Sequence, residues 1–192
     1  MTPKDVFRAL VEIPWIVFIV YWIIGAVKTR ANRETESFTS RFAVLLLEGV
    51  GYVLIFSGST GIGFLGTRFI PHTMAGAILG VVLVWSGVAL AIWARYHLAE
   101  YWSARGTIKE DHQLIRTGPY TYLRHPIYSG LVLATIGSAL VIDEWRCILG
   151  TCLVLVGYCF KAKKEEAMPS QQFGEAFREH QKDTGFLIPR FR

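Results

Sequence analysis

Hydrophobic residues gather in five segments of this chain, and polar stretches separate them. The segments lie at about 9–27, 42–58, 75–94, 127–142 and 145–160. Because a helix needs roughly 20 apolar residues to cross the hydrocarbon core of a bilayer, the first and third segments are long enough to span it and the second just reaches. The last two are short, and the turn Asp143-Glu144 predicts a tight helical hairpin over 127–160. The pattern predicts an all-α integral membrane protein with about five transmembrane helices.

The five segments divide a single domain into two parts. Residues 1–94 hold the first three hydrophobic helices and their loops, and residues 95–192 hold a polar loop region, the hairpin and a helical tail. Small residues favour close helix–helix packing in membranes. They recur in the third segment as Gly76, Ala77, Gly80 and Gly87. We therefore expect this helix to pack closely against a neighbour.

One acidic residue, Glu48, falls inside the second hydrophobic segment. An ionisable side chain is costly within a membrane helix, so such residues mark functional sites or face the bundle interior or water. Both readings of Glu48 stay open at this point.

The distribution of basic residues predicts the topology and the partners. The net charge is +5, and most of the 20 Lys and Arg residues lie in the loop 28–41, the stretch 95–126 and the tail 161–192. Five spans place these regions on one side, which the positive-inside rule makes cytoplasmic. We expect a cytoplasmic C-terminus and active site and an N-terminus on the opposite side. The charge then attracts anionic lipid heads, and we expect no nucleic-acid partner.

Several other site classes are not expected. All three cysteines, Cys147, Cys152 and Cys159, lie in the last hydrophobic segment, where they are typical of small buried hydrophobes. The histidines show neither H-E-x-x-H nor clustered Cys/His spacing, so we expect no metal site. The G-x-G-x-x-G match at 61–66 follows no predicted strand and indicates a flexible turn.

The run GPYTYLRHPIYSG at 118–130 combines a turn, aromatic rings and basic side chains. Pro126 suits the first position of a helix, where no N–H donor is needed, and this places His125 at or near the N-cap. Free N–H groups at that helix end, together with the charge of Arg124, make an anion site. The same residue types also form belts that anchor helices at lipid head groups. Residue types alone leave both interpretations open.

The tail holds a second charged cluster. Lys161 and Glu165 lie four residues apart and share one face of a continuing helix, and Glu166 falls on a neighbouring face. The alternative is an ordinary surface ion pair. After a helix break at Pro169, the spacing of aromatic and polar residues predicts a short amphipathic helix, followed by an apolar strip at 185–189.

These two clusters resemble a known family. The run HQLIRTGPYTYLRHPIYSG at 112–130 is similar to the signature of the isoprenylcysteine carboxyl methyltransferases, which form a wider group with the phospholipid N-methyltransferases. The Glu165-Glu166 pair, the later Phe173-Gly174 and the closing Ile-Pro are also similar to that family. The resemblance covers residues 95–192, about half of the chain.

The resemblance implies methyl transfer from S-adenosylmethionine to the carboxylate of a lipidated, isoprenylcysteine-like acceptor at the cytosolic face. The implied cofactor contacts are His112, Gln113, Leu114, Ile115, Tyr120, His125, Pro126, Ile127, Tyr128 and Glu165. Arg124 joins them through the anion-site argument. Lys161 stands where the family usually has the Arg that contacts the substrate, and it keeps the charge without the bidentate fork.

The residues agree with this chemistry. Glu165 suits the ammonium or sulfonium of the cofactor, and the helix end at Pro126 suits its carboxylate. An acceptor carboxylate is already ionised at pH 7, with a reference pKa of about 4, so Lys161 and Glu165 only need to position the reactants. An amine acceptor needs a base, for which Glu165 or Glu166 is available. Phospholipid N-methylation and a non-catalytic lipid-binding module are the alternative functions.

Overall fold

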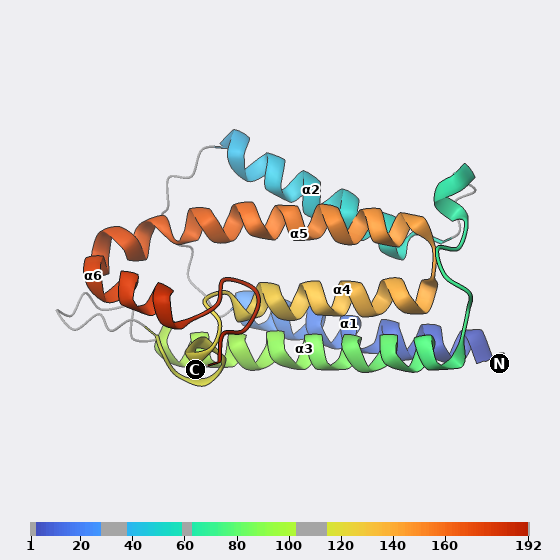
Figure 1. Cartoon of the computed structure of the whole chain (residues 1–192), viewed down its shortest axis with the longest axis horizontal. Coiled ribbons are helices and arrows are strands. Elements are labelled where there is room, and N and C mark those ends of the chain that lie inside the picture. The colour runs from blue at the N-terminus through green and yellow to red at the C-terminus, as the bar shows by residue number, and fades with distance from the viewer. Residues whose placement is uncertain (1–2, 28–37, 59–62, 103–114, 192) are drawn as a thin grey trace.

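The computed structural model describes residues 3–27, 38–58, 63–102 and 115–191. Within these ranges every regular element is a helix. The elements are α1 (Pro3–Val27), α2 (Phe38–Phe56), η1 (Gly63–Gly66), α3 (Met74–Trp102), η3 (Gly118–Thr121), α4 (Pro126–Ile142), α5 (Trp145–Glu165) and α6 (Ala167–Asp183). Helices α1 to α5 cover the five hydrophobic segments, and Figure 1 shows them gathered along one long axis. The predicted all-α architecture is confirmed for the described residues.

Three of the described helices are long and apolar enough to cross a membrane. They contribute the stretches Asp5–Gly25 in α1, Met74–Leu98 in α3 and Trp145–Glu165 in α5. Helices α2 and α4 contribute the shorter apolar stretches Phe42–Phe56 and Pro126–Ile142. These lengths and compositions are those of an integral membrane protein.

The apolar run of the last helix ends at 160, and α5 continues five residues further to Glu165, as the shared helical face of Lys161 and Glu165 requires. The expectation that this helix is short is wrong, because α5 with these residues is long enough to cross a membrane. The added residues are Lys, Ala and Glu, which are strong helix formers whatever their polarity. The helix therefore outlasts its hydrophobic pattern and carries Lys161 and Glu165 to the end of the bundle.

Glycines bring α3 and α4 into close antiparallel contact. A Cβ atom placed on Gly87 would lie 2.4 Å from the carbonyl oxygen of Gly130, and one on Gly80 would lie 2.7 Å from that of Gly137. Larger side chains at these positions would force the helices apart. The predicted packing role is thus confirmed for Gly80 and Gly87, whereas Gly76 meets only the Thr73 side chain one turn away.

Helices α2 and α5 form a second antiparallel pair by the same means. A Cβ atom on Gly51 would lie 2.7 Å from the carbonyl oxygen of Gly150. At the end of the bundle that carries η1, Arg146 donates from one guanidinium nitrogen to the carbonyl oxygens of Leu54, Ile55 and Ser57. This contact fixes the start of α5 to the last turn of α2.

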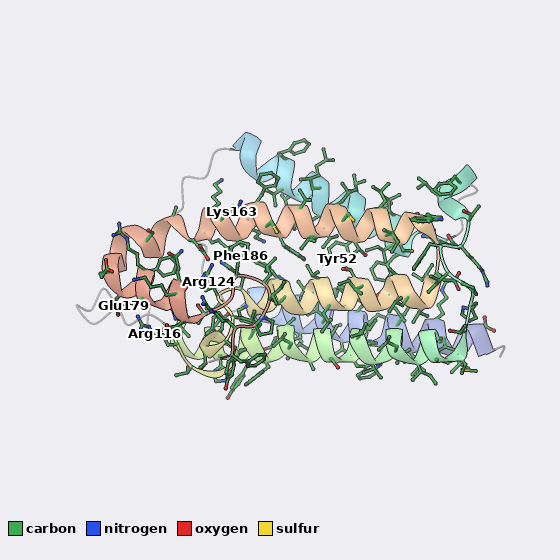
Figure 2. All side chains as sticks on the ribbon, in the orientation of Figure 1. Tyr52, Arg116, Arg124, Lys163, Glu179 and Phe186 are labelled. Carbon is green, nitrogen blue, oxygen red and sulfur yellow. The ribbon has the colours of Figure 1, made fainter. Side chains whose placement is uncertain are left out.

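Helix α1 joins the bundle through aromatic side chains. Trp15 is 6% exposed, donates its indole N–H to Ser138 Oγ over 3.1 Å, and meets Tyr52 and Phe56 edge-on. Tyr52 lies between the helices in Figure 2. Other residues of α1, including Ile23 and Ile24, are more than half exposed, as expected for a surface that faces lipid.

The chain ends beside the start of α4. The turn between α5 and α6 falls at Glu166, three residues before the predicted break at Pro169. A proline is tolerated in the first turn of a helix because its missing N–H has no partner there. After α6, the Arg124 N–H donates to the Gly185 carbonyl over 2.8 Å, and the Gly185 N–H donates to the Tyr122 carbonyl over 3.0 Å. The two predicted clusters are therefore neighbours in space (Figure 1).

Candidate functional site

Helix α4 begins as the sequence predicts. Pro126 is its first residue and His125 is its N-cap, with no side-chain hydrogen bond to the cap. The N–H groups of the first turn therefore have no intrahelical partner and point toward the loop before them. In that loop Gly118 has a φ of 58°, and a Cβ there would lie 2.6 Å from His97 Nε2. Glycine is thus the residue that this tight turn accepts.

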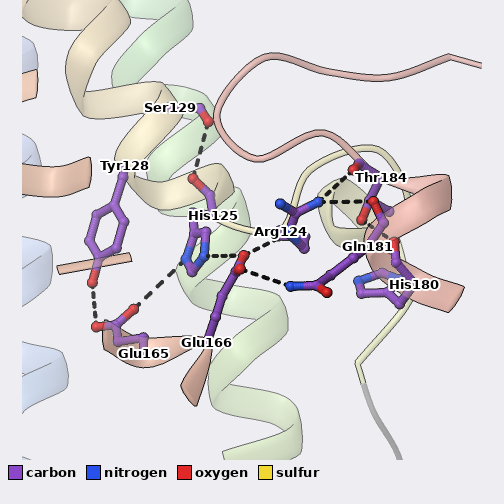
Figure 3. Close-up of polar contacts among 9 residues, drawn as sticks. All are labelled: Arg124, His125, Tyr128, Ser129, Glu165, Glu166, His180, Gln181 and Thr184. Carbon is purple, nitrogen blue, oxygen red and sulfur yellow. Dashed lines mark hydrogen bonds and ion pairs between the residues drawn. The ribbon is translucent and has the colours of Figure 1, made fainter. Parts of the chain in front are cut away.

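A half-buried ion-pair network joins the loop before α4 to the tail (Figure 3). Glu166 accepts a hydrogen bond from Arg124 Nε over 2.6 Å, and its Oε1 lies 3.1 Å from His125 Nε2. Gln181 donates to the other carboxylate oxygen over 3.0 Å. The same Arg124 also donates to the carbonyl oxygen of Thr184 over 2.7 Å.

This network holds Glu166 in its ionised form. Burial alone would raise the pKa of the Glu166 carboxyl, but the hydrogen bonds from His125 and Arg124 outweigh it and lower that pKa to about 2. Arg124 makes a further contact, because its guanidinium carbon lies 5.5 Å from the centroid of the Phe186 ring. Figure 2 labels both residues. Ligand contacts by Arg124 and Glu166 stay predictions, and in this structure both residues connect the two clusters.

Glu165 faces a different way from Glu166. It accepts a hydrogen bond from the Tyr128 hydroxyl over 2.6 Å, its second oxygen lies 3.8 Å from His125 Nδ1, and its side chain is 48% exposed. Tyr128 is stacked between the rings of His125 and Tyr158, at centroid distances of 5.7 and 4.8 Å. Glu165 therefore keeps acceptor capacity for a ligand.

Lys161 lies over the Tyr128 ring. Its Nζ is 5.3 Å from the ring centroid, which is within reach of a cation–π contact. Among the described residues Lys161 forms no ion pair, so the surface pair with Glu165 that sequence allowed is not made. Both residues instead meet at Tyr128.

A cavity of about 640 Å³ extends from Lys161 along the bundle. Residues of α1, α2, α4 and α5 line it. Its wall is mainly apolar and aromatic and is formed by Glu12, Trp15, Ile16, Phe18, Ile19, Trp22, Glu48, Tyr52, Phe56, Ile127, Tyr128, Leu131, Tyr158 and Lys161. Polar groups from Glu48, Tyr128 and Lys161 contribute to this wall. The cavity thus offers an apolar chain a surface that also carries three charged side chains, Glu12, Glu48 and Lys161.

The remaining predicted site residues fall in three places. Ile127 lines the cavity, and Pro126 is buried at the start of α4. Tyr120 is half-buried, and burial, together with the charge of Glu165, raises the pKa of its hydroxyl well above the ordinary value. Ile115 is half-buried near the start of its described segment. His112, Gln113 and Leu114 lie outside the described residues.

The N-terminal helices supply site residues that sequence reasoning did not name. Trp15 and Trp22 from α1 and Tyr52 from α2 line the cavity. The only available signal was the aromatic content of the hydrophobic segments. In the part of the chain that the structure describes, no three His, Cys, Asp or Glu residues gather as metal ligands do.

Fold and site define a helical membrane protein in which a mainly apolar cavity meets a charged cluster. The family profile of the phospholipid methyltransferases matches residues 75–176, which is more than half of the chain, so the chain belongs to this family. That family lies in the same group as the isoprenylcysteine carboxyl methyltransferases, so the resemblance read from the sequence is confirmed. The match includes Tyr128, Lys161 and Glu165 and leaves out α1 and α2.

One relative is an uncharacterised protein of Haemophilus influenzae. It is 26% identical over 97 residues, which cover 50% of this chain and 56% of that protein. The chain thus spans about half the length of the curated relative that it matches.

Proposed function

We propose that this protein transfers a methyl group from S-adenosylmethionine to the head group of a lipid-like acceptor that lies in the cavity. The observation that carries the proposal is the position of Lys161 and Tyr128, which belong both to the cavity wall and to the cluster around Glu165. Membership of the phospholipid methyltransferase family supports the same activity.

The donor set around Tyr128 fits the cofactor. S-adenosylmethionine carries a carboxylate, an ammonium, a sulfonium and an adenine, and it supplies an electrophilic methyl group when bound. Glu165 offers a carboxylate to a positive charge, and the first turn of α4 offers N–H groups to an anion. The rings of Tyr120 and Tyr128 offer faces to the adenine or to the sulfonium. We assign the cofactor to the residues from Tyr120 to Tyr128 and to Glu165, together with the stretch 112–115.

The cavity fits the acceptor. Ligand sites commonly measure about 300–1,000 Å³ and have mainly apolar walls with a few placed polar groups. An apolar chain along Trp15, Trp22 and Leu131 would bring its head to Lys161. The first candidate head group is the carboxylate of an isoprenylcysteine-like lipid. It is ionised at neutral pH, so Lys161 needs only to orient it while the bundle excludes water.

A second candidate head group is the amine of a phospholipid. It is favoured by Glu48, a carboxylate in the wall of the same cavity, and by the name of the matching family. An amine is protonated at neutral pH and must lose a proton before it reacts. Lys161 would then contact the phosphate of the head group.

A methyl-transfer assay tests the proposed activity. Purified protein in detergent is supplied with S-adenosylmethionine labelled in its methyl group and, separately, with extracted phospholipid and with prenylcysteine analogues. We expect label to enter the lipid fraction in one of the two reactions and to depend on Lys161. Absence of transfer to every lipid acceptor, with folded protein, would contradict the proposal.

We also propose that the site faces the cytoplasm. The support is the arrangement of the bundle, in which α6, the C-terminus and the start of α4 share one end (Figure 1), together with the basic residues of that end. A C-terminal green fluorescent protein fusion should fluoresce in bacterial cells, since this reporter folds in the cytoplasm and fails after export through the general secretory route. A dark fusion that is present in the membrane would place the site on the other side.

A further inference from the structure

We propose that Glu48 reads the charge of the acceptor head group: its carboxylate binds a cationic, proton-donating head group and disfavours an anionic one. The inference rests on the proposed function, because it takes the acceptor to lie in the cavity. Glu48 lies outside the part of the chain that matches the family profile, so its role is argued from its surroundings alone.

The packing of α2 on α5 directs Glu48 into the cavity. A Cβ atom on Gly157 would lie 3.0 Å from Glu48 Cγ. The side chain of Glu48 therefore passes α5 at Gly157, where no side chain blocks it. Glu48 then joins Tyr158 and Lys161 in the cavity wall. Gly157 and Lys161 lie four residues apart on α5, about one helical turn.

Among the described residues, the carboxylate of Glu48 has fewer hydrogen-bond partners than that of Glu166. Its Oε1 is buried and accepts no hydrogen bond from the described residues. By contrast, Glu166 is held by Arg124, His125 and Gln181. A buried polar oxygen without a donor is unfavourable. A donor that arrives with the acceptor would remove this cost and bind more tightly because of it.

The polar side chains near Glu48 have other partners, so a ligand would have to supply the hydrogen bond to Glu48 Oε1. The hydroxyls of Tyr52 and Tyr158 lie 2.9 Å apart and are bonded to each other. Lys161 is turned toward the face of Tyr128, whose hydroxyl is in turn bonded to Glu165. The cavity wall therefore presents a positive charge at Lys161 and a carboxylate at Glu48, while its other carboxylate, Glu12, is paired with Arg8. A head group with an anionic part and an ammonium part matches both.

The proposal assigns one proton movement to Glu48. An ammonium in contact with Glu48 gives one proton to Oε1, and the products are a neutral amine with a free electron pair and a neutral carboxylic acid. No bond other than the N–H bond breaks, and no further reactant is needed. Because an alkylammonium has a reference pKa near 10.4, this step provides the nucleophilic form that is scarce at neutral pH.

The experiment compares Glu48→Gln with wild type on two lipids. The probes are lysophosphatidylethanolamine, which has an amine, and a prenylcysteine analogue with a free carboxylate. Binding without cofactor is followed by the fluorescence of Trp15 and Trp22 in the cavity wall, and turnover is followed by methyl transfer. Glu179→Gln, the same chemical change on the exposed face of α6, is the matched control.

We expect Glu48→Gln to weaken binding of the amine lipid and to lower its turnover about 100-fold, the usual size of a general-base effect. Binding of the carboxylate lipid should not weaken. Glu48→Asp, which keeps the charge, should retain the preference for the amine, and Glu179→Gln should match wild type. S-adenosylhomocysteine affinity, measured by calorimetry, should be the same in all four proteins.

Two results would overturn the inference in distinguishable ways. If every protein binds S-adenosylhomocysteine and wild type methylates lipid, but Glu48→Gln leaves the ratio of the two lipids unchanged, Glu48 does not read the head group and the proposed function stands. If wild type binds no S-adenosylhomocysteine and methylates neither lipid, the proposed function fails and the inference fails with it.

Discussion

Tyr128 is the residue at which the two halves of the proposed site meet. Its hydroxyl donates to Glu165, its ring lies under Lys161, and its edge lines the cavity. Glu165 therefore contacts the hydroxyl of Tyr128, whereas Lys161 lies over its ring. This difference in contacts predicts that the cofactor and the acceptor depend on different charged residues.

Substitution of the two charged residues should separate binding from turnover. Glu165→Ala should weaken S-adenosylhomocysteine binding about tenfold or more, because a hydrogen bond to a charged group is worth about 1.5–3 kcal/mol. Lys161→Ala should leave that affinity unchanged and lower kcat/KM for the lipid. Lys163→Ala removes an exposed lysine two residues away and serves as the control. Calorimetry measures the affinity and the methyl-transfer assay measures kcat/KM. If both quantities are unchanged in both variants, the site does not lie at these residues.

The network around Glu166 should show in the pH dependence of stability. Its folded pKa of about 2 lies below its ordinary value of 4.5, so its stabilisation is complete above about pH 4.5 and is lost as the pH falls toward 2. Glu166→Gln should therefore lower the Tm at pH 7, and the difference from wild type should shrink by about pH 3. Thermal unfolding of detergent-solubilised protein measures it. A difference that stays constant down to that pH would contradict the ionic role.

The start of α4 could be predicted from the local sequence, whereas the contacts of Glu166 could not, because its partners are distant in the chain. The start of α4 at Pro126 and the N-cap at His125 follow from the missing N–H of proline, a property of the sequence at that point. The partners of Glu166 lie 41 and 42 residues away in the chain. They could not be predicted because the packing of α5 beside α4 brings them together. Sequence reasoning thus found Arg124 and Glu166 without finding that they bind each other.

At the scale of the helices, glycine contacts hold two antiparallel pairs, α3 with α4 and α2 with α5. The first pair carries the start of α4, and the second carries Lys161 and Glu165. Residues of α1 line the cavity together with residues from both pairs. The geometry of the site therefore depends on contacts far from the charged residues.

Gly87→Ala should destabilise the bundle. The new Cβ would lie 2.4 Å from the Gly130 carbonyl oxygen, so α3 and α4 must move apart, and overpacking of this kind costs about 1–3 kcal/mol. Gly49→Ala is the matched control, because a Cβ there meets nothing within 4 Å. Thermal unfolding should show a lower Tm for the first variant only. Equal Tm values for both variants would mean that the close contact does not hold the pair.

The hydrophobic pattern predicted where the five helices lie, but it does not mark the end of α5. The pattern stops at 160, whereas the backbone hydrogen bonds continue through polar residues to Glu165. The small residues Gly80 and Gly87 indicated a close neighbour but could not identify it as α4. The neighbour is α4 because α4 has small residues at the facing positions, Gly130 and Gly137. The pattern within a single helix does not show which other helix has matching small residues.

At the scale of the whole molecule, one end of the bundle combines segments from both halves of the chain. The loop before α4, the end of α5 and the tail form the charged cluster, while α1 and α2 close the cavity beside it. The family match covers the first group and leaves out α1 and α2. We infer that the shared part binds the cofactor and that the N-terminal helices select the acceptor.

Calorimetric titration of the purified, detergent-solubilised protein with S-adenosylhomocysteine tests the central claim most directly. The account predicts saturable binding of one ligand per chain, weakened by Glu165→Ala and unaffected by Lys163→Ala. Absence of binding by folded wild-type protein at high micromolar ligand would contradict it.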